Sequence, residues 1–514
     1  MQEVTSLKKK SSDKISISYN AFFVMAACYL VIPAAIMILG WIKLLIALPA
    51  ALLLILSLVF AIKGESALSK DRVLELPKKQ FIAIVVFSVL ATIVIGVGEI
   101  VAPMYDHAFR RAMLRDLINY DWPIYYDLSL QSNPVVNEML PDCTVAYSYY
   151  STFWMIPAVL GKLFGFMFGN IVLVIWSAFG IFLILTGVTF FTKKFTYASM
   201  VMLICYSGLD AIPYFFYMFT GTEDWMWLEG WTEHISFISN INNLLNVFNQ
   251  CIPCWLIVIL LMTCKSNKHI GLIAGVMFTY SPWATIGVVP LAAYALLSKE
   301  KGIRGLFSVA NIVPALTILG CFAPMYMANS SATSVSGTTL SFYGSIGKLL
   351  GALILVAVIE IAPSVLMTYK LFGKDKLLWV AAGTLLVLPL YKISNFNDLT
   401  MRGAMPAQFV LCVMLITVIG RFFSDNTDKK GRFNGRFTLK TIGCTLLLLV
   451  MSFIAFQQIL LVGLYTMNRA NEDFTEQIGS FGNINQEDYA ETVNGNFFVY
   501  DYEDQFFYRY MARR

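Results

Sequence analysis

Residues 21–40 read AFFVMAACYLVIPAAIMILG, a run of twenty residues without one charged side chain. As an α-helix such a run rises about 30 Å, which matches the hydrocarbon thickness of a bilayer. Comparable apolar stretches follow at residues 44–61, 81–97 and 441–462. They are continuous blocks, whereas strands of a membrane β-barrel would alternate apolar and polar residues, so helices are predicted.

The composition extends this prediction to the whole chain. Of its 514 residues, 58% are hydrophobic and 13% are charged, whereas a soluble globular chain carries about 25% charged residues. We predict an all-α polytopic membrane protein with about 11–13 transmembrane helices. Residues 1–463 form the membrane domain and residues 464–514 form an extracytoplasmic tail. The net charge of +5 is spread over short separate clusters, which does not indicate a nucleic-acid partner.

The basic residues predict the orientation, because short loops rich in Lys and Arg stay in the cytoplasm. The N-terminus is predicted to be cytoplasmic, with an uncleaved first helix as an anchor. Basic clusters lie at residues 63–79, 193–194, 265–268, 299–304, 370–376 and 421–440. The predicted outer segments are then residues 99–145, 220–240, 328–345, 391–402 and the C-terminal tail.

Two apolar segments, residues 149–164 and 270–297, begin and end on the same side under this rule. We therefore expect them to be dipping or broken helices, with breaks at Pro157, Pro282 and Pro290. Backbone groups freed by a break must face protein or a watery cavity, and such a cavity is a candidate site. The alternative is that these prolines only kink packed helices.

The predicted outer loop at residues 99–145 contains the densest polar cluster, MYDHAFRRAMLRDL at residues 104–117. In a helix, Asp106 and Arg110 are neighbours one turn apart, with His107 and Arg111 beside them and Arg115 one turn further on. A carboxylate beside guanidinium groups suits a transfer in which a hydroxyl loses a proton and a phosphate leaves. The alternative is a solvated amphipathic helix on the membrane surface.

Two further outer segments carry candidate residues. Glu233 and His234 follow Trp225, Trp227 and Trp231. Aromatic faces beside polar groups can hold sugar rings, and they are equally typical of an interfacial belt. Asp398 and Arg402 lie in SNFNDLTMRGAMPA at residues 394–407. Arg402 at the membrane boundary can bind the phosphate of a lipid-linked substrate, or it can extend to ordinary headgroups.

Asp210 and Glu360 lie within apolar segments. An ionisable group there is costly, which makes both functional candidates, unless they are hydrogen-bonded between helices. The chain has three histidines and no zinc motif, so no dedicated metal site is predicted, while a divalent cation held by carboxylates and a phosphate stays open. No nucleotide-binding or hydrolase motif is present, so the energy must arrive with the substrate.

Several of these segments resemble the C-type membrane glycosyltransferases, the GT-C superfold. The resemblance lies in residues 104–117, in DWPIYYDL at residues 121–128, and in YYSTFWMIPAVLGKLFG at residues 149–165. It implies transfer of a sugar from a polyprenyl-phosphate donor to a lipid, glycan or protein acceptor outside the cytoplasm, in a bacterial plasma membrane. The single Asp-His pair departs from members that have adjacent acids, and this leaves metal dependence open.

The resemblance also implies roles for individual residues. Asp106 would act at the acceptor, and His107 and His234 would orient substrates or share a proton. The residues expected to bind the substrate or its phosphate are Arg110, Arg111, Arg115, Glu233, Asp398 and Arg402. Two other functions remain open: a transporter or flippase for a lipid-linked glycan, with Asp210 and Glu360 along its pathway, and a component of a polysaccharide polymerase.

Overall fold

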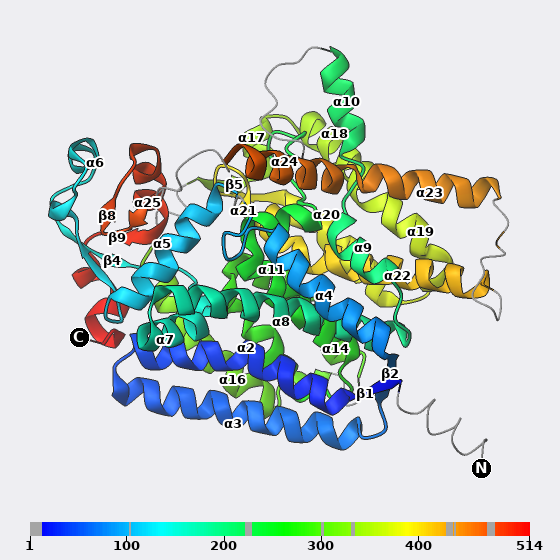
Figure 1. Ribbon diagram of the computed structural model, residues 1–514, viewed down its shortest axis with the longest axis horizontal. Coiled ribbons are helices and arrows are strands. Elements are labelled where there is room, and N and C mark those ends of the chain that lie inside the picture. Colours follow the sequence, from blue (N-terminus) through cyan, green and yellow to red (C-terminus); the bar gives the residue numbers. More distant parts are fainter. Residues whose placement is uncertain are drawn as a thin grey trace.

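The computed structural model describes residues 13–101, 104–220, 229–299, 303–329, 335–427, 435, 438–469 and 478–513. Helices dominate this part of the chain, and most of them run side by side in one bundle (Figure 1). Eight are long and apolar enough to cross a membrane: Tyr19–Trp41, Leu44–Leu68, Phe166–Thr192, Asn240–Thr263, Val309–Met327, Ile346–Phe372, Asp398–Asp425 and Leu439–Asn468. The predicted class, an all-α polytopic membrane protein, is therefore confirmed.

Four shorter apolar helical segments accompany these eight: Thr152–Phe164, Ile270–Tyr280, Pro282–Leu297 and Lys376–Leu390. Two of them belong to residues 270–297, where α12 (Ile270–Gly275) and α13 (Met277–Tyr280) are followed by α14 (Pro282–Leu297). Ser281 caps α14 through its side chain, and Pro282 occupies its first position. The lack of an N–H in proline costs no hydrogen bond there, because the first N–H groups of a helix have no partner within it. The expected break therefore lies at Pro282, whereas Pro290 lies inside α14 without ending it.

Residues 149–164 form a short helical segment before a long one. A turn at Thr152–Trp154 leads into α7 (Met155–Phe164), and α8 (Phe166–Thr192) follows directly. Gly165 makes the reversal with φ 91°, a backbone conformation that favours glycine. Pro157 lies in the first turn of α7 and does not break it, so the reversal comes from Gly165 and not from the proline.

The centre of the bundle is the packing of α8 against α2 (Tyr19–Trp41) and α11 (Asn240–Thr263). Gly180 and Gly187 of α8 leave so little space that a Cβ at either position would overlap its neighbours. The neighbours are also spaced by seven residues, with Tyr29 and Ile252 at the first glycine and Phe22 and Ile259 at the second. A seven-residue spacing returns to the same helix face, so the three helices meet along one line.

The other helices surround this centre. Among the spans, α3 is Leu44–Leu68, α16 is Val309–Met327, α18 is Ile346–Val356, α19 is Ala362–Phe372, α22 is Met405–Asp425, α23 is Leu439–Met451 and α24 is Phe453–Arg469. A π-helical turn, Ala357–Ile361, joins α18 to α19. Further helices of the described chain are α4 (Lys78–Val94), α9 (Ala198–Cys205), α10 (Ala211–Thr220), α15 (Ile303–Leu306), α17 (Thr339–Tyr343) and α20 (Lys376–Val387).

Several basic loops contact one another at one end of the bundle, which we call the basic end. Strand β1 (Lys14–Ser18) pairs antiparallel with β2 (Val73–Pro77) there. Glu65 is fully buried at the end of α3 and accepts hydrogen bonds from the backbone N–H groups of Lys265 and Ser266. Lys299 lies beside Cys264, with Nζ 2.9 Å from Sγ. The loops at residues 63–79 and 265–268 and the lysine at 299 thus share one end, as their charges predict.

The opposite end carries a small unit of short strands and helices. Strands β3 (Tyr125–Asp127), β4 (Thr144–Tyr147) and β9 (Phe498–Val499) form an antiparallel sheet in the order β3-β4-β9. With α5 (Asp106–Asn119) and α6 (Pro134–Met139) this sheet covers the end of the bundle (Figure 1). A separate two-stranded antiparallel sheet pairs β5 (Ser336–Thr338) with β6 (Tyr391–Ile393).

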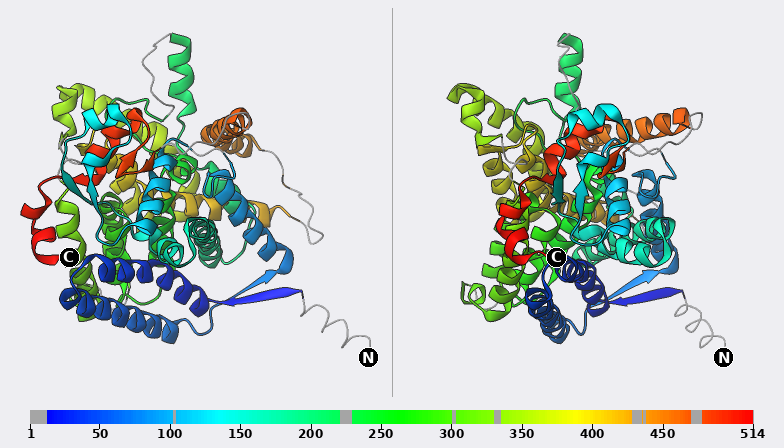
Figure 2. Two further views of the ribbon diagram at one scale, coloured as in Figure 1. Left: turned by 60° about the vertical axis from the view of Figure 1, so that its left-hand side comes forward. Right: turned by 90° about the vertical axis from the view of Figure 1, so that its left-hand side faces the viewer.

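Residues 478–513, which we call the cap, are built into this unit. They contain a hairpin of β7 (Gly479–Ser480) and β8 (Asn483–Ile484), then α25 (Ala490–Phe497) and β9. The cap ends beside α2 and α3, where Ile42 pairs with Ala512 and Lys43 donates its backbone N–H to Met511 (Figure 2). The C-terminal segment is thus folded onto the bundle, with its short strand β9 paired to β4.

The close approach at Gly187 yields a test of the central packing. Gly187→Ala should lower the thermal unfolding midpoint in detergent, because overpacking a core usually costs about 1–3 kcal/mol. Gly383→Ala in α20, where a Cβ meets nothing within 4 Å, is the matched control and should be neutral or slightly stabilising. Equal midpoints for the two variants would contradict the packing described above.

Candidate functional site

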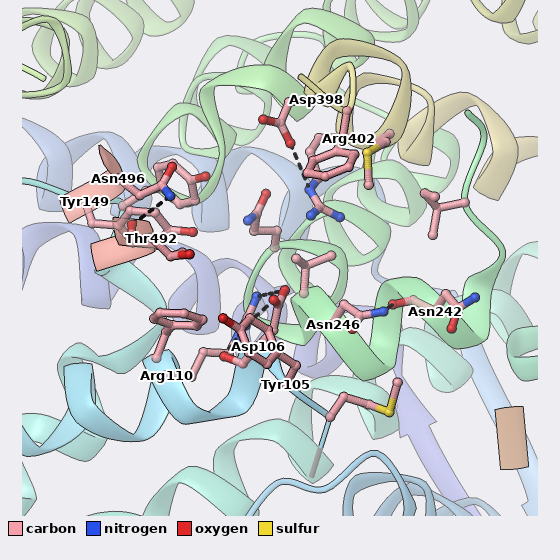
Figure 3. A pocket seen from close by; sticks show the side chains of 18 of the residues that line it. Tyr105, Asp106, Arg110, Tyr149, Asn242, Asn246, Asp398, Arg402, Thr492 and Asn496 are labelled. Atoms are coloured by element: carbon pink, nitrogen blue, oxygen red, sulfur yellow. Dashed lines mark hydrogen bonds and ion pairs between the residues drawn. The ribbon is translucent and has the colours of Figure 1, made fainter. Parts of the chain in front are cut away.

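A cavity of about 560 Å³ opens at the cap end of the bundle (Figure 3). Its walls come from segments far apart in the sequence: the start of α5, residues 149–150, the first half of α11, α21 (Asp398–Gly403), α24 and α25 of the cap. Four of the five predicted outer segments therefore meet in one place. The charged residues that line it are Asp106, Arg110, Glu229, Asp398 and Arg402.

The first pair of charges is Asp106 and Arg110 in the opening turns of α5. Arg110 donates from Nη1 to the carbonyl oxygen of Asp106 at 2.7 Å, lies 3.4 Å from its Oδ2, and donates from Nε to Oδ1 of Asn249 at 3.2 Å. The predicted relation of these two residues, one helical turn apart, is confirmed. The Arg110 side chain is 9% exposed and that of Asp106 is 38% exposed, so the protein holds the arginine while the carboxylate reaches the cavity.

The second pair has the same spacing on α21. Arg402 places Nε 3.8 Å from Oδ1 of Asp398, and within the described ranges its guanidinium has no hydrogen-bond partner. Asn397 caps α21 by accepting from the N–H of Thr400 and donates from its own side chain to the carbonyl of His234. The two pairs face each other across the cavity (Figure 3). Arg402 thus keeps donors available for an anionic ligand.

Two tyrosines, Tyr149 and Tyr150, line the same cavity. The rings of Tyr149 and Tyr150 stack with their centroids 3.9 Å apart. Burial raises the pKa of Tyr149, and the positive charges of Arg110 and Arg402 both oppose that rise. Both guanidinium groups are therefore close enough to act on one phenol. In the sequence these tyrosines belong to the segment at residues 149–165, and no role was predicted for them.

The first half of α11 supplies an amide wall through Asn242, Asn246 and Gln250. Beside it, Glu229 is 3% exposed and accepts hydrogen bonds from the N–H of Ser239 at 2.8 Å and from Nδ2 of Asn242 at 2.9 Å. Burial, with the nearby charge of Asp210, raises the pKa of Glu229 to about 8. These three amides were not predicted as site residues, although a spacing of four residues is a signal for side chains on one side of a helix.

His107, expected in the catalytic set, lies away from the cavity. It is 5% exposed, its Nε2 is 2.7 Å from the carbonyl oxygen of Leu245, and its ring packs on Phe248. Burial and the charge of Arg110 lower the pKa of His107 to about 4. The neutral imidazole of His107 donates a hydrogen bond to this carbonyl and so connects α5 to α11. His107 therefore has a structural role.

Arg111 and Arg115 also point elsewhere. Arg111 forms an ion pair with Glu99, and both guanidinium groups lie near the ring of Phe166, at 5.6 and 5.0 Å. Arg115 donates from Nη1 to the carbonyl oxygen of Gly479 in the cap. The structure therefore does not bring these two residues to the cavity with Asp106.

Arg115 and its neighbour Asp116 attach the cap to α5. Asp116 is 1% exposed and accepts hydrogen bonds from Tyr126 Oη at 2.9 Å and from the N–H of Phe481 at 2.8 Å. Burial raises the pKa of this carboxyl to about 6. Because these contacts hold the cap, Thr492 and Asn496 of α25 can form one wall of the cavity (Figure 3).

Glu233 and His234 belong to a neighbouring cluster and do not line the cavity. His234 Nδ1 is 3.2 Å from Nζ of Lys392, while Glu233 is 80% exposed and 3.9 Å from His234 Nε2. Trp225 and Trp227 lie outside the described residues. Within the described ranges, no three His, Cys, Asp or Glu side chains group closely enough to hold a metal ion.

The neutral state of His107 gives a pH-dependent test. The unfolded chain takes up a proton near pH 6.5, whereas folded His107 does so only near pH 4, so stability should fall as the pH drops through this interval. His107→Gln keeps an amide donor and removes the titration. The loss of thermal midpoint between pH 7.5 and pH 5 should be smaller in the variant, and equal losses would show that His107 is already charged when folded.

Comparisons with known proteins assign no family to this geometry. No family model, no curated protein and no solved structure matches the chain. The chemistry of the cavity is therefore inferred from the side chains that line it.

Proposed function

We propose that the chain is a membrane glycosyltransferase of the C type. It would transfer a sugar from a polyprenyl-phosphate donor to a hydroxyl of a lipid, glycan or protein acceptor outside the cytoplasm. The observation that carries this proposal is the meeting of an exposed carboxylate, Asp106, and an arginine with free donors, Arg402, in one cavity.

In the proposed reaction Asp106 accepts the proton of the acceptor hydroxyl as that oxygen attacks the anomeric carbon of the sugar. The bond between this carbon and the phosphate oxygen breaks, and its electron pair leaves with the polyprenyl phosphate. Arg402 binds the phosphate as negative charge develops, since a planar guanidinium can donate two parallel hydrogen bonds to it. Arg110 keeps Asp106 in place through the contacts to its backbone and side-chain oxygens.

The other walls fit a sugar attached to a lipid. Tyr149, Tyr150 and the amides of α11 offer stacking faces and neutral hydrogen-bonding groups. α24 borders the cavity through Gln458 and exposes Phe456 and Leu460, each 62% exposed, on the outside of the bundle. An isoprenoid chain in the surrounding lipid would therefore lie next to the cavity that takes its headgroup.

The proposal includes an orientation. The cavity end would face the outside of a bacterial plasma membrane, with the C-terminus there and the N-terminus in the cytoplasm. The support is that the loops rich in Lys and Arg contact one another at the opposite end, since such loops are retained in the cytoplasm.

A second candidate function is transport of a lipid-linked glycan, and one observation favours it. Asp210 and Glu360 are both buried and accept from the same donor, Nε1 of Trp231, at 3.0 and 3.2 Å. Two carboxyl groups this close cannot both be charged without strong repulsion, and a transporter can use such a pair to take up a proton. A polymerase component would share the chemistry of the transferase and would need a second lipid-linked substrate in the cavity.

Asp106→Asn should abolish transfer. Loss of a general base reduces the rate about 10²- to 10⁴-fold, measured with purified protein and a panel of polyprenyl-phosphate sugars, with water or added hydroxyl compounds as acceptors. Asp121→Asn, an exposed residue of the same loop, is the matched control and should retain activity. Binding of these donors without turnover, and a cellular function that survives Asp106→Asn but not Glu360→Gln, would favour transport instead.

Arg402→Gln should raise the KM for the donor by about 10- to 100-fold, since a hydrogen bond to a charged group contributes about 1.5–3 kcal/mol. Arg402→Lys should recover part of this loss, because an ammonium keeps the charge without the planar pair of donors. Arg111→Gln is the control: its guanidinium binds Glu99 and not the cavity. A donor KM that responds to Arg111 and not to Arg402 would refute the assignment of the phosphate site.

A further inference from the structure

The amide wall of α11 has a feature that phosphate binding and proton transfer do not use. Asn242 and Asn246 lie one helical turn apart, and Gln250 follows four residues later, after a break in the helix. We call these three residues the stripe. All three line the cavity. The helix is interrupted beside them at Val247, with φ −140° and ψ 42°. Figure 3 shows Asn242 and Asn246 on one side of the cavity, next to the space between the two Asp-Arg pairs.

The amide donors of Asn242 and Asn246 are already engaged, whereas the side-chain acceptor of Gln250 is not. Asn242 donates from Nδ2 to Glu229 at 2.9 Å, and Asn246 donates from Nδ2 to the backbone oxygen of Asn242 at 3.0 Å. Gln250 is 1% exposed, and its Oε1 has no hydrogen-bond partner in the described part of the chain. A buried acceptor left unpaired costs about 1–3 kcal/mol. A ligand that donates a hydrogen bond to Gln250 would remove this cost.

The charge of the wall restricts the ligand further. Glu229 is the titratable group hydrogen-bonded to the stripe. Arg110 of α5 contacts α11 at Asn249, which does not line the cavity, and Arg402 is carried by α21. An anionic group placed against these three residues would meet a buried carboxyl and uncharged amides. A neutral group with hydroxyl or amide N–H donors would meet acceptors.

We propose that Gln250, together with Asn242 and Asn246, forms the subsite for the sugar of the donor, and that this sugar is neutral and directs hydroxyl or acetamido N–H groups at α11. This inference rests on the proposed function and adds the substrate class. The cavity is then divided in two: Arg402 binds the phosphate of the carrier, and α11 reads the sugar attached to it.

The test measures binding of three probes to the purified full-length protein: polyprenyl phosphate, polyprenyl-phosphate hexose and polyprenyl-phosphate uronic acid. Wild type should bind the hexose form about 10-fold or more tightly than the bare carrier, and the uronic acid form no better than the bare carrier. Gln250→Met, which keeps the approximate shape and removes the acceptor, should abolish the preference for hexose while leaving the affinity for the bare carrier unchanged.

Gln408→Met is the matched control, because Gln408 is also a buried glutamine with an unpaired Oε1 but does not line the cavity. It should keep the preference for hexose. Retained affinity for the bare carrier shows that Gln250→Met is folded; if that affinity is lost, Gln250→Asn, which keeps an acceptor, should show an intermediate preference.

Three results would overturn the inference: equal binding of hexose and bare carriers by wild type, equal binding of hexose and uronic acid forms, or a preference that survives Gln250→Met. If wild type transfers sugars but shows one of these results, the subsite is wrong and the transferase function stands. If wild type binds none of the carriers, both fail together.

Discussion

Hydrocarbon offers no hydrogen-bond partners, so each polar side chain within this bundle needs a partner from the protein or a place in a cavity. α11 shows the consequence most clearly, because 94% of an apolar stretch of 18 residues in this helix is buried inside the protein. Its second half is apolar and packs against α2 and α8 where the glycines of α8 allow close approach. Its first half carries the amides, and these reach Arg110, Glu229 and the cavity. The site lies where the polar half of a buried helix meets the end of the bundle.

Much of the fold could be predicted because its signals are local. An apolar run such as residues 21–40 is long enough to form a spanning helix by itself. A proline such as Pro282 lacks a backbone N–H, so it marks the start of a new helix without information from the rest of the chain. The cap could not be predicted in the same way. Its strand β9 has two residues and pairs with β4, more than 300 residues earlier in the chain. The alternation of aromatic and acidic residues near the C-terminus was compatible with a strand and with an irregular tail, and only long-range pairing decides between them.

The same distinction explains the candidate site. The Asp106–Arg110 and Asp398–Arg402 pairs are predictable because a helix brings residues four apart together. Their meeting in one cavity depends on the packing of α5 and α21, which no local pattern contains. His107, Arg111 and Arg115 were expected in the site, although their spacing argues against it. They are four residues apart, so they lie on a line of the helix beside that of Asp106 and Arg110. In the structure these three residues bind α11, Glu99 and the cap.

The two Asp-Arg pairs have the same composition and spacing, yet their surroundings give them different properties. Arg110 has three hydrogen-bond acceptors from the protein, in the backbone and side chain of Asp106 and in Asn249, so binding an anion would require it to exchange contacts that it already has. Arg402 has one ion pair at 3.8 Å. The helix that carries it is fixed independently, by the Asn397 side chain, which accepts from the N–H of Thr400, and by the close approach of the Gly287 and Gly403 backbones. A base needs a fixed position, whereas a phosphate-binding group needs free donors on a rigid support. The first pair meets the former requirement and the second meets the latter, so the division of roles follows from the neighbours of each pair rather than from its own residues.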